Sequence, residues 1–139
     1  MRARARSSSA TQSIPDNTAT TVTFNQAVFD TVGLLNTSTS ELVVPSTGRV
    51  TGAWQVHAQI TWDNAAAGGR DVVIQQNAVT IAHSHVLGSN DDLTLNVLIL
   101  VNDPNPGTTF RVRALQTSGS PLNLLTEPEN TFFEIIHLW

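Results

Sequence analysis

Apolar and polar side chains alternate along much of the chain, a pattern typical of strands that rest one face on a core. The clearest case runs over residues 48–63, where Trp54 and Val56 fall on one face and Gln55 and His57 on the other. Successive side chains of a strand point to opposite faces, so this period of two predicts one long strand with a buried face.

The same alternation predicts further strands, and clusters of turn residues separate them. These strands cover residues 3–8, 21–25, 42–44, 71–76, 79–86, 93–101, 110–116, 122–125 and 132–138. Asn77-Ala78 is predicted to be a hairpin turn, although Ala is a poorer residue than Gly where φ must be positive. No helix of normal length and no linker is indicated. Residues 1–139 are therefore predicted to form a single all-β domain, a sandwich or a barrel.

Two of the predicted strands are apolar on both faces. In residues 93–101, Leu98 and Leu100 oppose the main apolar face, and residues 132–138 carry apolar side chains on both sides. A strand that is apolar on both faces is normally buried on both, whereas a sandwich of this size covers one. The pattern favours association between subunits, and the alternative is that the strand ends pack under loops.

Composition and charge exclude several classes of function. The chain has 139 residues and a net charge of −4, all seven basic residues are Arg, and Cys is absent. Disulfides and thiolate chemistry are thereby excluded. The acidic balance argues against nucleic-acid binding, and neither an apolar run long enough for a membrane span nor a signal peptide is present. We expect neither nucleic acid nor membrane as a partner.

Several segments resemble the C1q/TNF-like domains of bacterial and phage proteins. The similar segments are TQSIPDNT (11–18), VTFN (22–25), FDTVGL (29–34), LVVP (42–45) with GRV (48–50), NDDLTL (90–95), LNLL (122–125) and TFFEIIHL (131–138). The resemblance implies a two-sheet antiparallel jelly roll that assembles as a homotrimer, with the C-terminal strand in the middle of the sheet facing the three-fold axis. It also implies a binding or structural module rather than an enzyme. The predicted trimer interface comprises Leu98, Leu100, Phe133, Ile135, His137 and Trp139.

Metal chemistry has two candidate locations. His83 and His85 are two apart on a predicted strand and share a face, as metal ligands would. A cupin-like metalloenzyme would need further ligands, which the sequence does not show unless Asp91, Asp92 or a neighbouring subunit supplies one, so polar strand residues are the favoured interpretation. Some members of the resembled family bind calcium, for which Asn90, Asp91, Asp92 and Asp103 could offer oxygen atoms, although these residue types are also ordinary turn formers. We expect no cofactor.

Catalysis is not predicted, because the chain lacks a Gly-x-Ser-x-Gly nucleophile elbow. Trp54 and Trp62 share the apolar face of the long strand and are expected in the core. Trp139 is left as a candidate for carbohydrate binding or for the subunit interface.

A partner-binding role is indicated for Arg2, Arg4 and Arg6, which share one face of an extended segment. They could contact an acidic partner surface, or they could protect an edge strand by charge. The leading hypothesis is a phage virion protein, a trimeric decoration protein bound to the major capsid protein on the outer shell. The alternative is the receptor-binding knob of a tail or head fibre, which would recognise a host surface glycan or protein.

Overall fold

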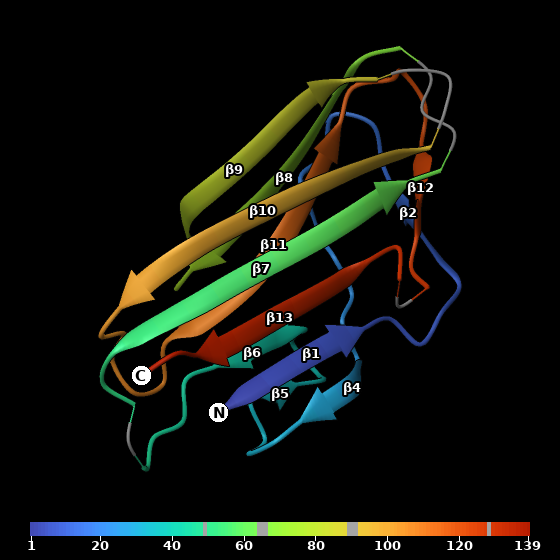
Figure 1. The fold of residues 1–139 in the computed structure, drawn as a ribbon. Helices are drawn as coiled ribbons and strands as arrows, with labels where there is room; N and C mark the ends of the chain where they lie inside the picture. The colour runs from blue at the N-terminus through green and yellow to red at the C-terminus, as the bar shows by residue number, and fades with distance from the viewer. Residues whose placement is uncertain (49, 64–66, 89–91, 128) are drawn as a thin grey trace.

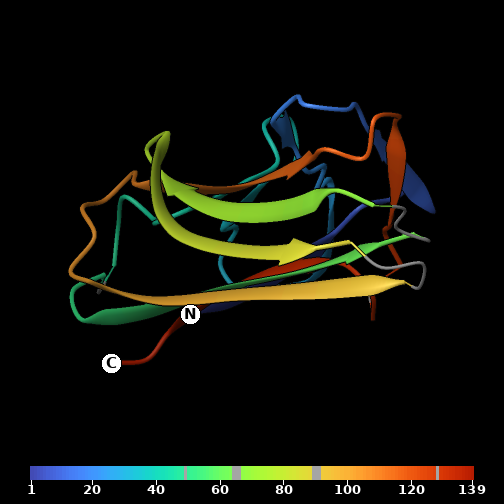
Figure 2. The same ribbon diagram turned by 90° about the horizontal axis from the view of Figure 1, so that it is seen from above.

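The computed structural model describes residues 1–48, 50–63, 67–88, 92–127 and 129–139, and every regular element within them is a β-strand. The strands form two antiparallel sheets that lie face to face, as Figures 1 and 2 show from two directions. Among the described residues no helix could cross a membrane. The all-β sandwich predicted from the alternation is confirmed.

Sheet A carries the long strands at the front of Figure 1. Side by side lie β10 (Leu93–Asn102), β7 (Ala53–Trp62), β13 (Phe132–His137), β1 (Arg2–Arg6) and β4 (Gln26–Asp30). At the C-terminal end of β7, β12 (Leu122–Leu125) pairs with β7, and β2 (Thr11–Ile14) pairs with β12. The C-terminal strand therefore lies in the middle of its sheet, as the family resemblance implies.

Sheet B forms the second layer. Its order is β5 (Leu35–Asn36), β6 (Glu41–Val43), β11 (Thr109–Gln116), β8 (Gly69–Gln76) and β9 (Val79–Leu87), and β3 (Thr20–Thr21) also pairs with β11. Within the described part of the chain, β9 is the outermost strand of this sheet beside β8.

The core lies between the two sheets and contains the inward side chains of both. Trp54 and Trp62 are fully buried, as the sequence predicts. The other large, fully buried apolar side chains are Phe24, Phe110, Phe133, Ile14, Leu34, Leu42, Ile60, Ile74 and Leu124. Burying one such side chain contributes roughly 1.5–3 kcal/mol, so this layer supplies most of the free energy that favours folding.

The strand predictions hold best where the alternation is long. The long strand begins at Ala53 rather than at residue 48, because Gly52 has a φ of 114° and its N–H bonds to Asp103 Oδ1 at 2.6 Å. Three strands were not predicted, β2, β4 and β5. They are two to five residues long and lack a clear alternation of apolar and polar side chains, so the period of two does not reveal them.

The β8–β9 hairpin contains the predicted two-residue turn and also a bulge. Asn77 and Ala78 have φ values of 47° and 68°, and Gln76 pairs with Val79. Positive φ at both central positions defines the type I′ turn that suits a two-residue hairpin. Farther along, Ile74 pairs with Ala82 while Gln75 pairs with Thr80, so one extra residue of β9 shifts the register.

Replacing Ala78 by Gly should stabilise the protein by about 1 kcal/mol. An L-residue with a Cβ pays roughly 1–2 kcal/mol in the left-handed region, whereas Gly pays none of that strain. Chemical denaturation of Ala78→Gly measures the gain in the free energy of unfolding. The matched control is Ala82→Gly within β9, which should lose roughly 0.5–1 kcal/mol. A destabilised Ala78→Gly would contradict the turn geometry.

The two chain ends lie next to each other at one end of sheet A (Figure 1). The backbone N–H of His137 donates to the carbonyl oxygen of Met1 at 2.9 Å. This bond extends the pairing of β1 with β13, so the two ends stabilise one another through the sheet.

Candidate functional site

The outer face of sheet A, meaning the side chains of its strands that point away from the core, is the larger candidate site. One row of cross-strand partners runs over five strands: Leu98 on β10, His57 on β7, Glu134 on β13, Arg4 on β1 and Phe29 on β4. Directly opposed side chains on one face lie close enough to interact. The row therefore forms one continuous surface.

Apolar side chains gather on the β10 and β13 parts of this face. Leu98 and Leu100 are 55% and 54% exposed in the single chain. Through the register, Leu100 and Ile136 both lie opposite Gln55, and the Phe132 ring meets His57 edge-on with centroids 5.1 Å apart. Phe132 is largely buried and Ile136 half-buried, so Leu98 and Leu100 are the large exposed apolar side chains of this region, a feature typical of an interaction surface.

The structure corrects the predicted interface at Phe133 and Ile135. Phe133 and Ile135 are fully buried in the core of the single chain, because they pair with Ala58 and Val56, whose side chains point inward. His137 is also held within the chain, with its ring stacked 4.6 Å from Trp54. Phe133 and Ile135 therefore face the core rather than the outer surface, whereas His137 is half-buried.

The residues of the predicted interface that remain exposed are Leu98, Leu100 and Trp139, the last at 67%. The outward side chains of β13 are Phe132, Glu134 and Ile136. Since β13 is apolar on both faces, its sequence alone does not reveal which face turns inward. Its pairing with β7 decides that.

The arginines of β1 are integrated into the sheet. Because β1 lies between β13 and β4, the interpretation of a charged edge strand is wrong. Arg4 Nε donates to Glu134 Oε2 at 2.7 Å and its guanidinium lies 4.3 Å from the Phe132 ring centroid. The Arg2 guanidinium lies 5.0 Å from the centroid of Phe29. Arg4 is thus engaged within the chain rather than free for an acidic partner.

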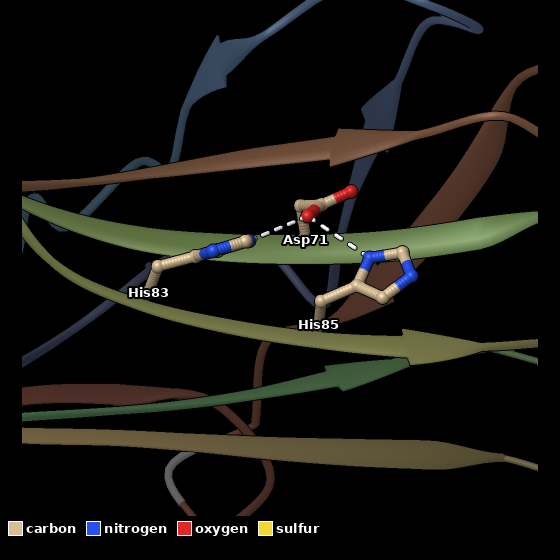
Figure 3. A group of neighbouring side chains, drawn as sticks. All are labelled: Asp71, His83 and His85. Atoms are coloured by element: carbon tan, nitrogen blue, oxygen red, sulfur yellow. Dashed lines mark hydrogen bonds and ion pairs between the residues drawn. The ribbon is translucent and has the colours of Figure 1, made fainter.

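A second candidate site is a polar cluster on the outer face of sheet B. Asp71 on β8 and His83 and His85 on β9 point toward one another (Figure 3). Asp71 Oδ1 lies 2.6 Å from His83 Nε2 and 3.0 Å from His85 Nδ1. The possible metal-ligating atoms of the three side chains all lie within 4.8 Å of one another. The structure thus places Asp71 where a third ligand could stand, a residue that the sequence did not single out.

The bulge in β9 creates this cluster. A regular hairpin continuing from the Gln76–Val79 pair would place Asp71 opposite Ser84, with both His side chains on the other face of the sheet. With one extra residue in β9, Asp71 instead pairs with His85. A bulge re-aims side chains in this way and is frequent next to functional sites. Because nothing in the sequence marks the bulge, the part played by Asp71 could not be predicted.

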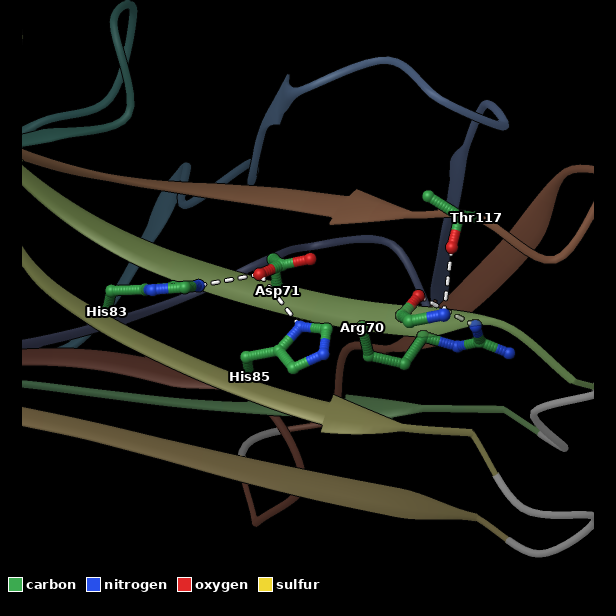
Figure 4. Close-up of polar contacts among 6 residues, drawn as sticks. Arg70, Asp71, His83, His85 and Thr117 are labelled. Atoms are coloured by element: carbon green, nitrogen blue, oxygen red, sulfur yellow. Dashed lines mark hydrogen bonds and ion pairs between the residues drawn. The ribbon is translucent and has the colours of Figure 1, made fainter.

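Gly69 makes room for His85. A Cβ at position 69 would lie 2.9 Å from His85 Cε1, closer than side chains tolerate. Gly69 is itself fixed, since its N–H donates to Thr117 Oγ1 at 2.8 Å and its carbonyl accepts from the Thr117 N–H at 3.1 Å (Figure 4). Next to it, the guanidinium of Arg70 is fully buried and donates to the Gly69 carbonyl, and its desolvation lowers the pKa of Arg70 below the usual range.

A cavity of about 350 Å³ adjoins the cluster on the outer face of sheet B. Asp71 and His83 line it together with polar side chains of β8, β9 and β11, namely Gln75, Thr80 and Arg113. The Arg113 side chain is held by a hydrogen bond to the carbonyl of Ala19. The cavity brings one acidic, one imidazole and one basic group together, which suits recognition of a small polar ligand.

Of the calcium ligands considered from the sequence, the two that lie within the described residues, Asp92 and Asp103, do not share one site. Asn90 and Asp91 lie outside the described residues. Asp92 and Asp103 flank the two ends of β10, and ten strand residues span about 30 Å, so these two carboxylates cannot share an ion. Asp103 acts as a turn residue, with a φ of 46° and its Oδ1 bound to the Gly52 N–H.

The arrangement of the two sheets is that of a TNF-like jelly roll. Solved structures with this fold superpose on nearly the whole chain. Murine APRIL at pH 5.0 matches with a TM-score of 0.74 and 14% identity over 99% of this chain and 98% of that one. At pH 8.0 murine APRIL matches with a TM-score of 0.68 and 16% identity over the same shares of the two chains.

Eiger TNF from S. frugiperda matches with a TM-score of 0.68 and 13% identity, over 100% of this chain and 92% of that chain. At these identities the likeness establishes the fold and leaves the function to be argued from the sites. No protein-family model matches the sequence, and no curated protein matches it significantly.

Proposed function

We propose that this protein is a non-enzymatic structural and binding module that functions as a homotrimer. The observation that carries the proposal is the exposed apolar part of the outer face of sheet A, above all Leu98 and Leu100, each more than half exposed. Both residues lie on a strand whose other face packs in the core, so a second layer is needed to cover them.

A closed ring of identical subunits is the simplest way to cover this surface. Leu98 and Leu100 form an exposed apolar strip on β10, at one side of sheet A. Two strands away on β13, the half-buried Ile136 and the largely buried Phe132 form a second, less exposed strip. Two separate apolar strips on one chain allow a head-to-tail contact, in which the strip of one subunit meets a different strip of the next. Such contacts close into a ring when the rotation between subunits is a third of a turn. A trimer is also what the C1q/TNF-like resemblance implies.

The specific role that we propose for this module is decoration of a phage capsid, on the outer surface of the virion. The supporting observations are the resemblance to phage and bacterial C1q/TNF-like domains and the shape of the proposed assembly, a trimer that suits the local three-fold positions of an icosahedral shell. The major capsid protein would be the partner. Arg2 and Arg6, at the two ends of β1, are the basic residues proposed to contact it, while Arg4 is engaged with Glu134.

Capsid binding tests this role. The purified chain, added to shells that lack it, should bind saturably in multiples of three copies per site. Arg2→Ala with Arg6→Ala should weaken binding by about tenfold, because exposed charge pairs each contribute up to about 1 kcal/mol. The matched control is Arg111→Ala on sheet B, whose guanidinium is bound to Gln75 Oε1 at 2.8 Å and which should leave capsid affinity unchanged. Absence of capsid binding would contradict decoration.

The second candidate is the receptor-binding knob of a fibre. The cavity beside Asp71 and Arg113 favours it, because a hollow lined by charged and polar groups suits a glycan or a peptide side chain. Binding to host cells or to purified surface polysaccharide, without affinity for capsids, would support the knob and exclude decoration.

A further inference from the structure

We infer that Asp71, His83 and His85 form a binding site for one divalent transition-metal ion per chain, of the zinc type. The inference is independent of the trimer and of any virion role, since the cluster lies on the outer face of sheet B, away from the outer face of sheet A (Figures 2 and 3).

The donor set is the first argument. Two imidazole nitrogens and one carboxylate oxygen are the ligands with which proteins hold zinc and its neighbours in the first transition series when the site stays open to solvent. The nitrogens of His83 and His85 lie 2.6 Å and 3.0 Å from Asp71 Oδ1. Metal bonds of about 2.0–2.2 Å would place neighbouring ligand atoms about 3.3 Å apart. Rotations about the side-chain bonds convert the cluster to that geometry. They move the ligand atoms by a few tenths of an ångström to somewhat over an ångström.

The backbone is the second argument, because two local features place the ligands. The extra residue of β9 turns both histidines to the face of Asp71. The missing side chain at Gly69 leaves space for the His85 ring, and Thr117 fixes that glycine. All three ligands lie on two directly paired strands, which hold a constellation more rigidly than loops do.

The open side of the site is the third argument. The side chains of His83 and His85 are about half exposed and that of Asp71 is 20% exposed, so an ion can enter from solvent. The adjoining cavity of about 350 Å³ offers room for the water molecules that complete a coordination shell around three protein ligands. A bound ion would cross-link β8 to the outer strand β9, and would therefore raise the thermal stability of the protein by an amount that grows with the logarithm of the free ion concentration above the dissociation constant.

Metal titration tests the inference. The chain, stripped with a chelator and titrated with zinc by calorimetry, should bind one ion per chain. The cobalt-loaded protein should show visible absorption that reports nitrogen and oxygen ligands. His83→Ala, His85→Ala and Asp71→Asn should each lower zinc affinity at least about tenfold, since losing even an outer partner of a ligand costs 10–100-fold. The melting temperature of wild type should rise with added zinc, and those of the three variants should not.

Two further variants distinguish the loss of the metal site from unspecific effects of a substitution in this region. Ser84→Ala lies between the two histidines in sequence, on the opposite face of β9, and should bind zinc as wild type does. Gly69→Ala should weaken zinc binding by displacing the His85 ring while keeping all three ligands. Absence of zinc uptake by wild type, or uptake that the three ligand variants leave unchanged, would overturn the inference, and circular dichroism of each variant confirms that its fold is intact.

Discussion

Replacing Leu98 and Leu100 together by Asp should convert the protein from a trimer to a monomer. Light scattering of wild type should give a concentration-independent mass of about 45 kDa, three copies of the 15.0 kDa chain. In the double variant the two new carboxylates of each subunit would be forced into a contact that excludes water. Burying an unpaired charge costs several kcal/mol, which exceeds what the remaining contacts of a small interface supply. The mass should then fall to 15.0 kDa.

The control for this result is a pair of exposed aliphatic residues on the other sheet. Val79 and Leu87 on β9 are 66% and 74% exposed, more than Leu98 and Leu100, but lie on sheet B. Val79→Asp with Leu87→Asp should leave the mass at three chains. A monomeric wild type, or a double variant of Leu98 and Leu100 that remains trimeric, would show that the outer face of sheet A is not the contact.

Gly68→Ala should be strongly destabilising, with a loss of about 3–5 kcal/mol in the free energy of unfolding. Gly68 has a φ of 102°, and a Cβ there would lie 2.0 Å from the carbonyl oxygen of Thr117 and 2.6 Å from its carbonyl carbon. Both obstacles are backbone atoms. The Thr117 segment cannot move aside without breaking its two hydrogen bonds to Gly69.

Gly119→Ala is the control that separates the cost of the backbone conformation from the cost of a steric clash. Gly119 has a similar φ of 88°, but nothing lies within 4 Å of a Cβ at that position. It should therefore lose only the conformational cost of roughly 1–2 kcal/mol. Urea denaturation of both variants measures the difference. Equal losses would mean that the close approach of Thr117 to Gly68 is not maintained in solution.

The sequence predicts the long strands well because each of them has one face in the core and one in solvent. Trp54 and Val56 alternate with Gln55 and His57, and the structure places the first pair in the core. Residues 132–138 lack that contrast. Their strand is apolar on both faces, so only pairing with β7 determines that Phe133 points inward, and a shift of one residue would exchange the two faces.

In the polar cluster, too, the sequence alone does not determine which face of a strand points where, and here the uncertainty comes from a single position. The spacing of His83 and His85 indicates a shared face, and the structure confirms it. One additional residue in β9 decides which face of the sheet the two histidines occupy. It also decides that Asp71 is the third side chain of the cluster, because it changes the partner of Asp71. Bulges depend on sheet twist and packing rather than on a residue signature, so this site becomes visible only in the folded chain.

The adjacency of the chain ends has a consequence for connectivity. Met1 and His137 are joined by a backbone hydrogen bond, so the polypeptide is close to a closed circle. Linking the ends with a short spacer would add little loop-closure entropy. The chain could then be opened at another surface turn, such as the one that contains Gly119, to give a circular permutant with the same sheets.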